Sequence, residues 1–141
     1  MKPPLFRYEA PRTLRDAVAV LASDPDAMVL AGGQSLVPAM NFRVATPSLL
    51  VDIQHVEGLK GIAIEDDTIV IKAMTRHREL ELDPEVRRVN PLIAETMQHV
   101  AHVPIRNRGT VVGSLCHADP SADMPLLFVL LDGTLVATSP V

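Results

Sequence analysis

Two short stretches of the sequence combine residue types that can bind a phosphate or another anion. The first reads Ala31-Gly32-Gly33-Gln34-Ser35-Leu36 and follows the apolar run Met28–Leu30. Glycine adopts backbone conformations that other residues avoid, so a strand that ends in two glycines can expose consecutive peptide N–H groups. Such groups bind anions without a basic side chain, and Ser35 adds a hydroxyl donor. The alternative is a tight turn between a strand and a helix.

The second stretch runs from Arg108 to Pro125 and offers both hydrogen-bond donors and acceptors. Residues 108–114 are rich in glycine, threonine and serine, and the carboxylates of Asp119 and Asp123 follow. A diphosphate needs N–H and O–H donors, whereas sugar or ribityl hydroxyls also need acceptors. This combination suits a dinucleotide better than a simple anion. The alternative is an ordinary polar loop with a turn at Asp119-Pro120.

Other combinations of reactive side chains have less support. His99, His102, Cys116 and His117 could form a zinc site, but no Cys-x-x-Cys pair is present and the first two fall at the end of an expected helix. Cys116 is equally consistent with a small core residue, and no spacing supports a cysteine–histidine nucleophile. We therefore expect no catalytic residue and no metal ligand.

A dinucleotide-binding domain of the Rossmann type is the main alternative. Gly32-Gly33 follows a strand, and Asp52 lies about 20 residues further on, where a ribose-binding acid would be expected. However, the glycines do not form Gly-x-Gly-x-x-Gly, and Pro38 interrupts the position of a long helix. Asp52 is more simply a turn or cap residue at the end of a strand.

The elements expected to position the first stretch form a small helix-and-strand lobe over residues 11–53. Thr13 is a predicted N-cap, Asp16 favours the positive end of a helix, and apolar residues follow at positions 14, 17, 18 and 21. Apolar runs at 28–31 and 49–51 predict buried strands.

From Gly58 onward a different pattern predicts a second lobe. Apolar residues at 62–64 and 68–71 flank an acidic turn and predict an antiparallel hairpin. Thr75 is predicted to cap a short helix that ends at Leu82, and proline follows a capping residue at positions 84 and 91. Residues 106–125 are expected to be irregular, followed by an apolar segment at 126–131 and a strand at 134–137. The expected fold class is α+β.

The composition excludes several classes of protein. The chain has 13 basic and 17 acidic residues, 3% aromatic residues and no tryptophan, which disfavours a nucleic-acid binder. Arginine pairs such as Arg106/Arg108 are expected to be solvated, and His55 and His77 are expected at the surface near turns. No segment approaches the length of a membrane span or a signal sequence, and the single Cys116 indicates a reducing compartment. We therefore expect a cytoplasmic protein that does not insert into membranes.

Five stretches spread along almost the whole chain form a recognisable pattern, and its two glycine-containing motifs are well separated. The stretches are Phe6-x-Tyr8-x-x-Pro11, Ala31-Gly32-Gly33-Gln34-Ser35-Leu36-x-Pro38, Ala73-Met74-Thr75, Arg106-Asn107-x-Gly109-Thr110 and Gly113-Ser114-Leu115-x-His117-Ala118-Asp119-Pro120-x-Ala122-Asp123-x-Pro125. With these motifs in this order, the sequence resembles the FAD-binding (medium) subunit of the molybdenum hydroxylases, the family of carbon monoxide dehydrogenase and xanthine dehydrogenase.

The resemblance implies a two-lobed FAD-binding domain of the vanillyl-alcohol-oxidase-like type, with an α/β lobe at 1–55 and a second α+β lobe at 56–141. In that family two glycine-containing loops hold the FAD diphosphate, and an aspartate that corresponds to Asp123 meets the ribityl chain. Carried over, the first loop comprises Leu30, Ala31, Gly32, Gly33, Gln34, Ser35, Leu36 and Val37, and the second comprises Thr110, Val111, Val112, Gly113 and Ser114.

The resemblance also implies a function and two protein partners. In this family hydroxylation occurs at a molybdenum cofactor on a large subunit, and electrons pass through 2Fe-2S clusters on a small subunit to the FAD and then to an acceptor. We therefore expect an electron-transfer subunit of an oxidoreductase complex. The alternative is a non-catalytic assembly module, or a truncated remnant, that keeps the fold without tight FAD binding.

Three departures from the family pattern bear on cofactor binding. Val112 stands where the family has a glycine, and Lys72 replaces a small residue before Ala73. The chain also lacks the last strands and the C-terminal domain of such subunits, so we expect it to be truncated. A glycine there would either permit a positive φ or let a phosphate oxygen approach the backbone closely. Val112 is expected to strain the second loop in the first case and to occupy the ligand's space in the second, so we expect the chain alone to bind FAD weakly.

Overall fold

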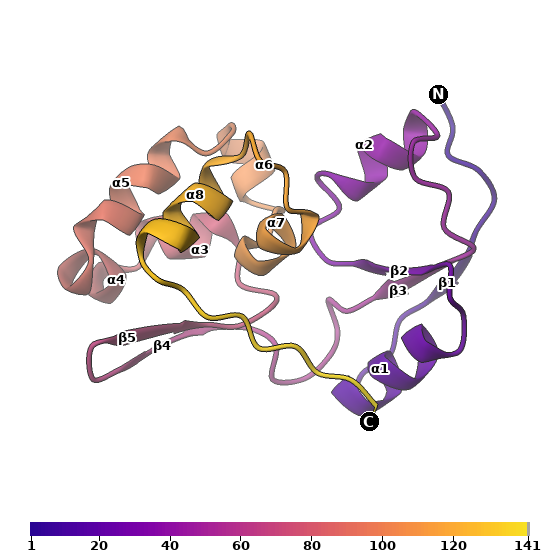
Figure 1. Ribbon diagram of the computed structural model, residues 1–141, viewed down its shortest axis with the longest axis horizontal. Helices are drawn as coiled ribbons and strands as arrows, with labels where there is room; N and C mark the ends of the chain where they lie inside the picture. The colour runs from indigo at the N-terminus through magenta and orange to yellow at the C-terminus, as the bar shows by residue number, and fades with distance from the viewer. Residues whose placement is uncertain (141) are drawn as a thin grey trace. The chain divides into compact units, whose positions relative to one another are not determined.

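The computed structural model describes residues 1–140, and the chain divides into two compact units (Figure 1). Unit 1 contains Met1–Gly58 together with the last residues from Leu135 onward, and unit 2 contains Leu59–Thr134.

Unit 1 is built around a parallel three-stranded sheet with the strand order β1-β3-β2. Its elements, in chain order, are β1 (Arg7–Glu9), α1 (Leu14–Ala22), β2 (Ala27–Leu30), α2 (Leu36–Asn41) and β3 (Leu49–Asp52). All four residues of the central strand β3 are buried. Leu30 pairs with Asp52, so β2 and β3 end at the same edge of the sheet, where the first glycine stretch begins.

The predicted elements of unit 1 are confirmed with small shifts of their ends. Thr13 is the N-cap of α1, and its Oγ1 accepts a hydrogen bond from the backbone N–H of Asp16 at 3.1 Å. The strands predicted at 28–31 and 49–51 are found at Ala27–Leu30 and Leu49–Asp52. Only the second is buried as expected, because Met28 and Val29 of β2 are each 42% exposed.

Unit 2 packs a set of short helices against a β-hairpin (Figure 1). Its elements are β4 (Ile62–Glu65), β5 (Thr68–Ile71), α3 (His77–Leu82), α4 (Pro84–Val89), α5 (Pro91–His99), α6 (Val103–Arg106), α7 (Val111–His117) and α8 (Asp123–Leu130). The hairpin pairs Ile62 with Ile71 and Ile64 with Ile69. Because alternate residues of a strand share a face, these four isoleucines form one apolar surface, which packs against the helical core.

The core of unit 2 is formed by helix residues that lie far apart in sequence: Leu80, Val86, Ile93, Met97, Val100, Val111, Met124 and Leu127. The predicted starts of α4 and α5, each with proline as the first helical residue, are confirmed. Asp83 caps α4 through hydrogen bonds from the N–H groups of Glu85 and Val86, whereas the Asn90 side chain makes no capping bond at α5.

Several expectations for unit 2 are wrong. The N-cap of α3 is Arg76 rather than Thr75, whose hydroxyl instead donates to the carbonyl of Gly61 at 2.7 Å. Residues 106–125 are largely helical, because this segment includes all of α7 and the start of α8. Residues 134–137 form no strand, since they pair with no other strand among the described residues.

Arg106 is buried rather than solvated. Its Nε donates to Oε2 of Glu81 at 2.8 Å, and its Nη1 donates to the carbonyls of Val100 and Ala101 at 2.9 Å each. Arg78 also contacts Glu81, at 2.8 Å. Burial alone would raise the pKa of Glu81, but the hydrogen bonds from the two arginines outweigh it and hold this pKa below its ordinary value.

Candidate functional site

The first glycine stretch depends on one backbone conformation that only glycine adopts easily. β2 ends at Leu30, and Gly33 has a φ of +69°. A Cβ at Gly33 would lie 3.3 Å from Cδ1 of Leu30 and 3.3 Å from Cγ2 of Val37. The N–H of Val37 donates to the carbonyl of Gly33 at 3.2 Å and leads the chain into α2. The turn is therefore tight, and its two ends pack directly against Gly33.

Three consecutive amides in this turn have no hydrogen-bond acceptor in the part of the chain that the structure describes. Among residues 1–140, the backbone N–H groups of Gly32, Gly33 and Gln34 donate no hydrogen bond. The Gln34 side chain bonds the carbonyl of Gly32 at 3.1 Å, and the hydroxyl of Ser35 makes no capping bond to α2. Consecutive unpaired N–H groups beside a residue with positive φ form an anion-binding concavity. The residues present therefore fit a phosphate group.

Asp52 is confirmed as a turn residue at the end of a strand. It is 4% exposed, and its Oδ1 accepts the N–H of Gln54 at 2.9 Å. Its Oδ2 accepts the hydroxyl of Tyr8 at 2.6 Å and the side-chain amide of Gln54 at 3.2 Å. The hydrogen bond to Asp52, followed by burial and by the negative charge of Asp52, raises the pKa of Tyr8. The partnership with Tyr8 was missed, because nothing local links residues 44 positions apart.

The second stretch is the beginning of a helix rather than a loop. Thr110 is buried and is the N-cap of α7, where its Oγ1 accepts the N–H of Gly113 at 3.2 Å. The N–H of Ser114 donates to the carbonyl of Thr110 at 3.1 Å. The N–H groups of Gly113 and Ser114, which were expected to bind a ligand, are therefore used in hydrogen bonds within the helix.

Of the two expected effects of Val112, backbone strain is wrong. Val112 lies in the first turn of α7, and neither it nor Gly113 has a positive φ. Valine fits a helical φ, so it costs little here beyond its modest helix propensity. Its side chain still occupies space that a glycine would leave open.

The two aspartates near α8 have different surroundings. Asp119 accepts hydrogen bonds from the N–H and the hydroxyl of Ser121, at 2.9 and 2.7 Å. Its pKa is lowered by these bonds, the hydroxyl bond first. Asp123 is the first residue of α8 and is exposed, and its carboxylate has no hydrogen-bond partner among the described residues. The N-cap of α8 is Ala122, so Asp123 does not cap this helix, and its ligand role remains a prediction.

His77 is buried, contrary to expectation, beside the segment that leads into α7. Its backbone N–H donates to the carbonyl of Gly109 at 3.0 Å, and a Cβ at Gly109 would lie 2.9 Å from its Nδ1. Neither ring nitrogen has a hydrogen-bond partner in the described part of the chain. Burial, and secondarily the charge of Arg106, lowers the pKa of His77 to about 4.

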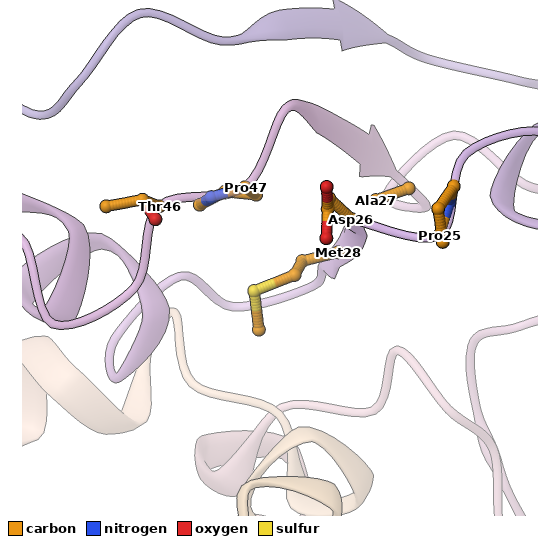
Figure 2. Close-up of a pocket in the computed structure, with 6 residues that line it drawn as sticks. All are labelled: Pro25, Asp26, Ala27, Met28, Thr46 and Pro47. Carbon is orange, nitrogen blue, oxygen red and sulfur yellow. The ribbon is translucent and has the colours of Figure 1, made fainter.

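Other possible sites receive no support. Within residues 1–140, no group of three or more histidine, cysteine or acidic side chains could hold a metal ion, and Cys116 is exposed. No helix in that range is both long and apolar enough to cross a membrane. An open hollow of about 250 Å³ lies before β2 and β3 (Figure 2). It is lined by Pro25, Asp26, Ala27, Met28, Thr46 and Pro47, at the opposite edge of the sheet from Gly33.

The chain is similar to known proteins over nearly its whole length. Residues 4–141 match the model of a family described as the FAD binding domain in molybdopterin dehydrogenase. The 6-hydroxypseudooxynicotine dehydrogenase complex subunit alpha of Paenarthrobacter nicotinovorans is 46% identical over 140 residues, covering 99% of this chain and 47% of that protein. The carbon monoxide dehydrogenase medium chain of Hydrogenophaga pseudoflava is 41% identical, with coverages of 99% and 49%.

A solved structure agrees with this match. The structure of quinoline 2-oxidoreductase from Pseudomonas putida 86 superposes with a TM-score of 0.88 at 45% identity, covering 91% of this chain and 45% of that one. The chain thus shares a fold of mixed helices and sheets with these proteins and spans about half the length of the relatives it matches.

Proposed function

Because the chain belongs to the family of FAD-binding domains found in molybdopterin dehydrogenases, we propose that it is the FAD-binding, electron-transfer part of a molybdenum hydroxylase complex. FAD supplies the redox chemistry of such a subunit. The residues of the chain bind the cofactor, orient it and shape its electrostatic surroundings. No side chain is assigned a role as general acid or base.

The observation that carries the proposal is the set of unpaired amides at Gly32, Gly33 and Gln34. A diphosphate is an anion with several acceptor oxygens, and it would take up these N–H groups without a basic side chain. The Ser35 hydroxyl, which makes no capping bond to α2, is a further donor within the segment Leu30–Val37.

We assign supporting roles to two further groups in unit 2. Thr110–Ser114 would contribute cofactor contacts, weakened because the N–H of Gly113 already bonds Thr110. Asp123 would accept hydrogen bonds from ribityl hydroxyls, since its carboxylate has no partner among residues 1–140. In finer detail, we propose that residues 1–55 and 56–141 are the two lobes of a vanillyl-alcohol-oxidase-like domain.

The partners follow from the family. Relatives carry the names "complex subunit alpha" and "medium chain", which describe parts of assemblies with several subunits. We propose that this chain acts beside a large subunit with the molybdenum cofactor and a small subunit with 2Fe-2S clusters, in the cytoplasm. The alternative, an assembly module without tight FAD binding, is supported by the internal use of the Gly113 N–H.

The test is a pair of glycine substitutions matched for backbone strain. Gly33 and Gly58 both have positive φ, at +69° and +78°, so alanine at either costs roughly 1–2 kcal/mol of stability. A Cβ at Gly58 would meet nothing within 4 Å, whereas one at Gly33 lies in the tight turn. FAD is titrated calorimetrically into the parent, Gly33→Ala and Gly58→Ala, and flavin absorbance is recorded for each purified protein.

We expect Gly33→Ala to weaken FAD binding by about tenfold or more, while Gly58→Ala binds like the parent. Equal affinities in both folded variants would refute the assignment of the diphosphate to this turn. A parent protein that neither purifies with flavin nor binds added FAD would favour the assembly module.

A further inference from the structure

The carboxylate of Asp52 connects three parts of unit 1 at the edge where the parallel strands end. It accepts the hydroxyl of Tyr8 from β1 at 2.6 Å, and the N–H and side-chain amide of Gln54 at 2.9 and 3.2 Å. Asp52 itself is the last residue of the central strand β3. One buried side chain therefore joins the middle of β1 to the end of β3 and to the turn that follows it.

This turn is joined directly to the start of the anion-binding segment. Leu30 is the parallel partner of Asp52, and the N–H of Ile53 donates to the carbonyl of Leu30 at 3.1 Å. The side chain of Leu30 packs against Gly33, where a Cβ would lie only 3.3 Å from its Cδ1. A displacement of residues 52–54 would thus move Leu30 and, with it, the turn that presents the three unpaired amides.

We propose that Asp52 is a positioning residue for phosphate binding, which holds the Gly32–Gln34 amides in place through Gln54, Ile53 and Leu30. The inference rests on the proposed function, because its consequence is read as FAD affinity. Asp52 does not contact the ligand in this role. Its carboxylate is already engaged by three donors, so it differs from the ribose-binding acid of the Rossmann alternative.

Unit 1 provides a matched control at the opposite edge of the same sheet. Asp24 also accepts three hydrogen bonds, from the hydroxyl of Ser48, the N–H of Asp26 and the guanidinium of Arg7. These partners lie at the beginnings of the strands. Loss of the Asp24 carboxylate should lower stability without moving the glycine turn.

The experiment compares Asp52→Ala, Asp52→Asn and Asp24→Ala in the full chain. Asparagine keeps an oxygen for the N–H of Gln54 and an amide that can donate to the hydroxyl of Tyr8, and it loses only the acceptor for the Gln54 side-chain amide, so it should keep the turn in place. FAD affinity is measured by titration, the melting temperature by circular dichroism, and amide hydrogen exchange at Val37 by NMR. The Val37 N–H reports on the turn itself, because it donates to the carbonyl of Gly33.

We expect Asp52→Ala to bind FAD about tenfold more weakly than Asp24→Ala at a similar melting temperature, with faster exchange at Val37. Asp52→Asn should bind within about threefold of the parent. Equal affinity and equal Val37 exchange in the two alanine variants would overturn the proposal and leave Asp52 a purely structural residue.

A failure of the proposed function would give a different result. If the parent binds no FAD, that function is refuted, and the Val37 exchange rates still decide whether Asp52 holds the turn. Unchanged exchange in Asp52→Ala would then overturn the inference independently.

Discussion

Acidification should destabilise unit 2 through His77. The side chain is 5% exposed, and neither ring nitrogen has a partner among residues 1–140. Burial, and then the positive charge of Arg106, lowers its pKa from 6.5 to about 4. A charged imidazole in this position would be both desolvated and repelled, so the folded protein keeps His77 neutral.

The sign and size of the effect follow from proton linkage. Between pH 6.5 and 4 the unfolded chain binds a proton at His77 that the folded chain does not, so stability falls as the pH falls through this window. The full difference corresponds to about 3 kcal/mol at or below pH 4, at 1.36 kcal/mol per pH unit. Between pH 7 and pH 5 the loss attributable to His77 is about 2 kcal/mol.

Denaturant unfolding at pH 7 and pH 5, followed by NMR signals of unit 2, measures this loss. Carboxylates such as that of Glu81 also bind protons on acidification and change the stability. The quantity to compare is therefore the loss of unfolding free energy between pH 7 and pH 5 in the parent and in His77→Gln. His55→Gln is the control for a histidine replaced at an exposed position. We expect His77→Gln to lose about 2 kcal/mol less than the parent on acidification. An imidazole that titrates near 6.5 by NMR, or identical losses in parent and variant, would refute the reasoning.

Two further pairs of substitutions test roles assigned in unit 2. Asp123→Ala should weaken FAD binding by about 1–3 kcal/mol at an unchanged melting temperature. Asp119→Ala, which removes only local hydrogen bonds, should leave the FAD affinity unchanged. A lower melting temperature with unchanged FAD affinity in Asp123→Ala would exclude Asp123 as a ligand. Glu81→Ala leaves the buried guanidinium of Arg106 without its carboxylate and should cost about 3 kcal/mol in urea unfolding. Glu85→Ala, which breaks an exposed ion pair, should cost less than about 1 kcal/mol, and equal costs would contradict the importance of burial.

Features that depend on neighbouring residues could be predicted from the sequence. The hairpin at β4 and β5 follows from alternating isoleucines around an acidic turn, and the caps at Thr13 and Asp83 follow from their own side chains. The Gly33 turn belongs to the same group, since a positive φ is a local property of glycine.

Features that depend on distant partners could not be predicted in this way. The buried guanidinium of Arg106 has its charged partner, Glu81, 25 residues away in the sequence. His77 is buried because Gly109 allows its ring to approach the backbone closely. Nothing adjacent in the sequence distinguishes these two side chains from ordinary solvated ones.

The helical nature of α7 was missed for a different reason. Its sequence, Val111–His117, begins with two β-branched residues and a glycine, all of which have low helix propensity. Tertiary contacts outweigh that preference, because Val111 belongs to the core cluster and its N–H bonds the carbonyl of Thr75. The cap at Thr110 then begins the helix.

The two glycine-containing segments look alike in the sequence but use their amides in opposite ways. In Gly32–Gln34 the N–H groups face no acceptor in residues 1–140, whereas the N–H of Gly113 is taken by Thr110 as part of a helix start. A phosphate gains most from donors that have no competing partner, since an existing hydrogen bond must first be broken. The first segment should therefore dominate FAD affinity in this chain. Any effect of Val112 then arises from the bulk of its side chain rather than from backbone strain.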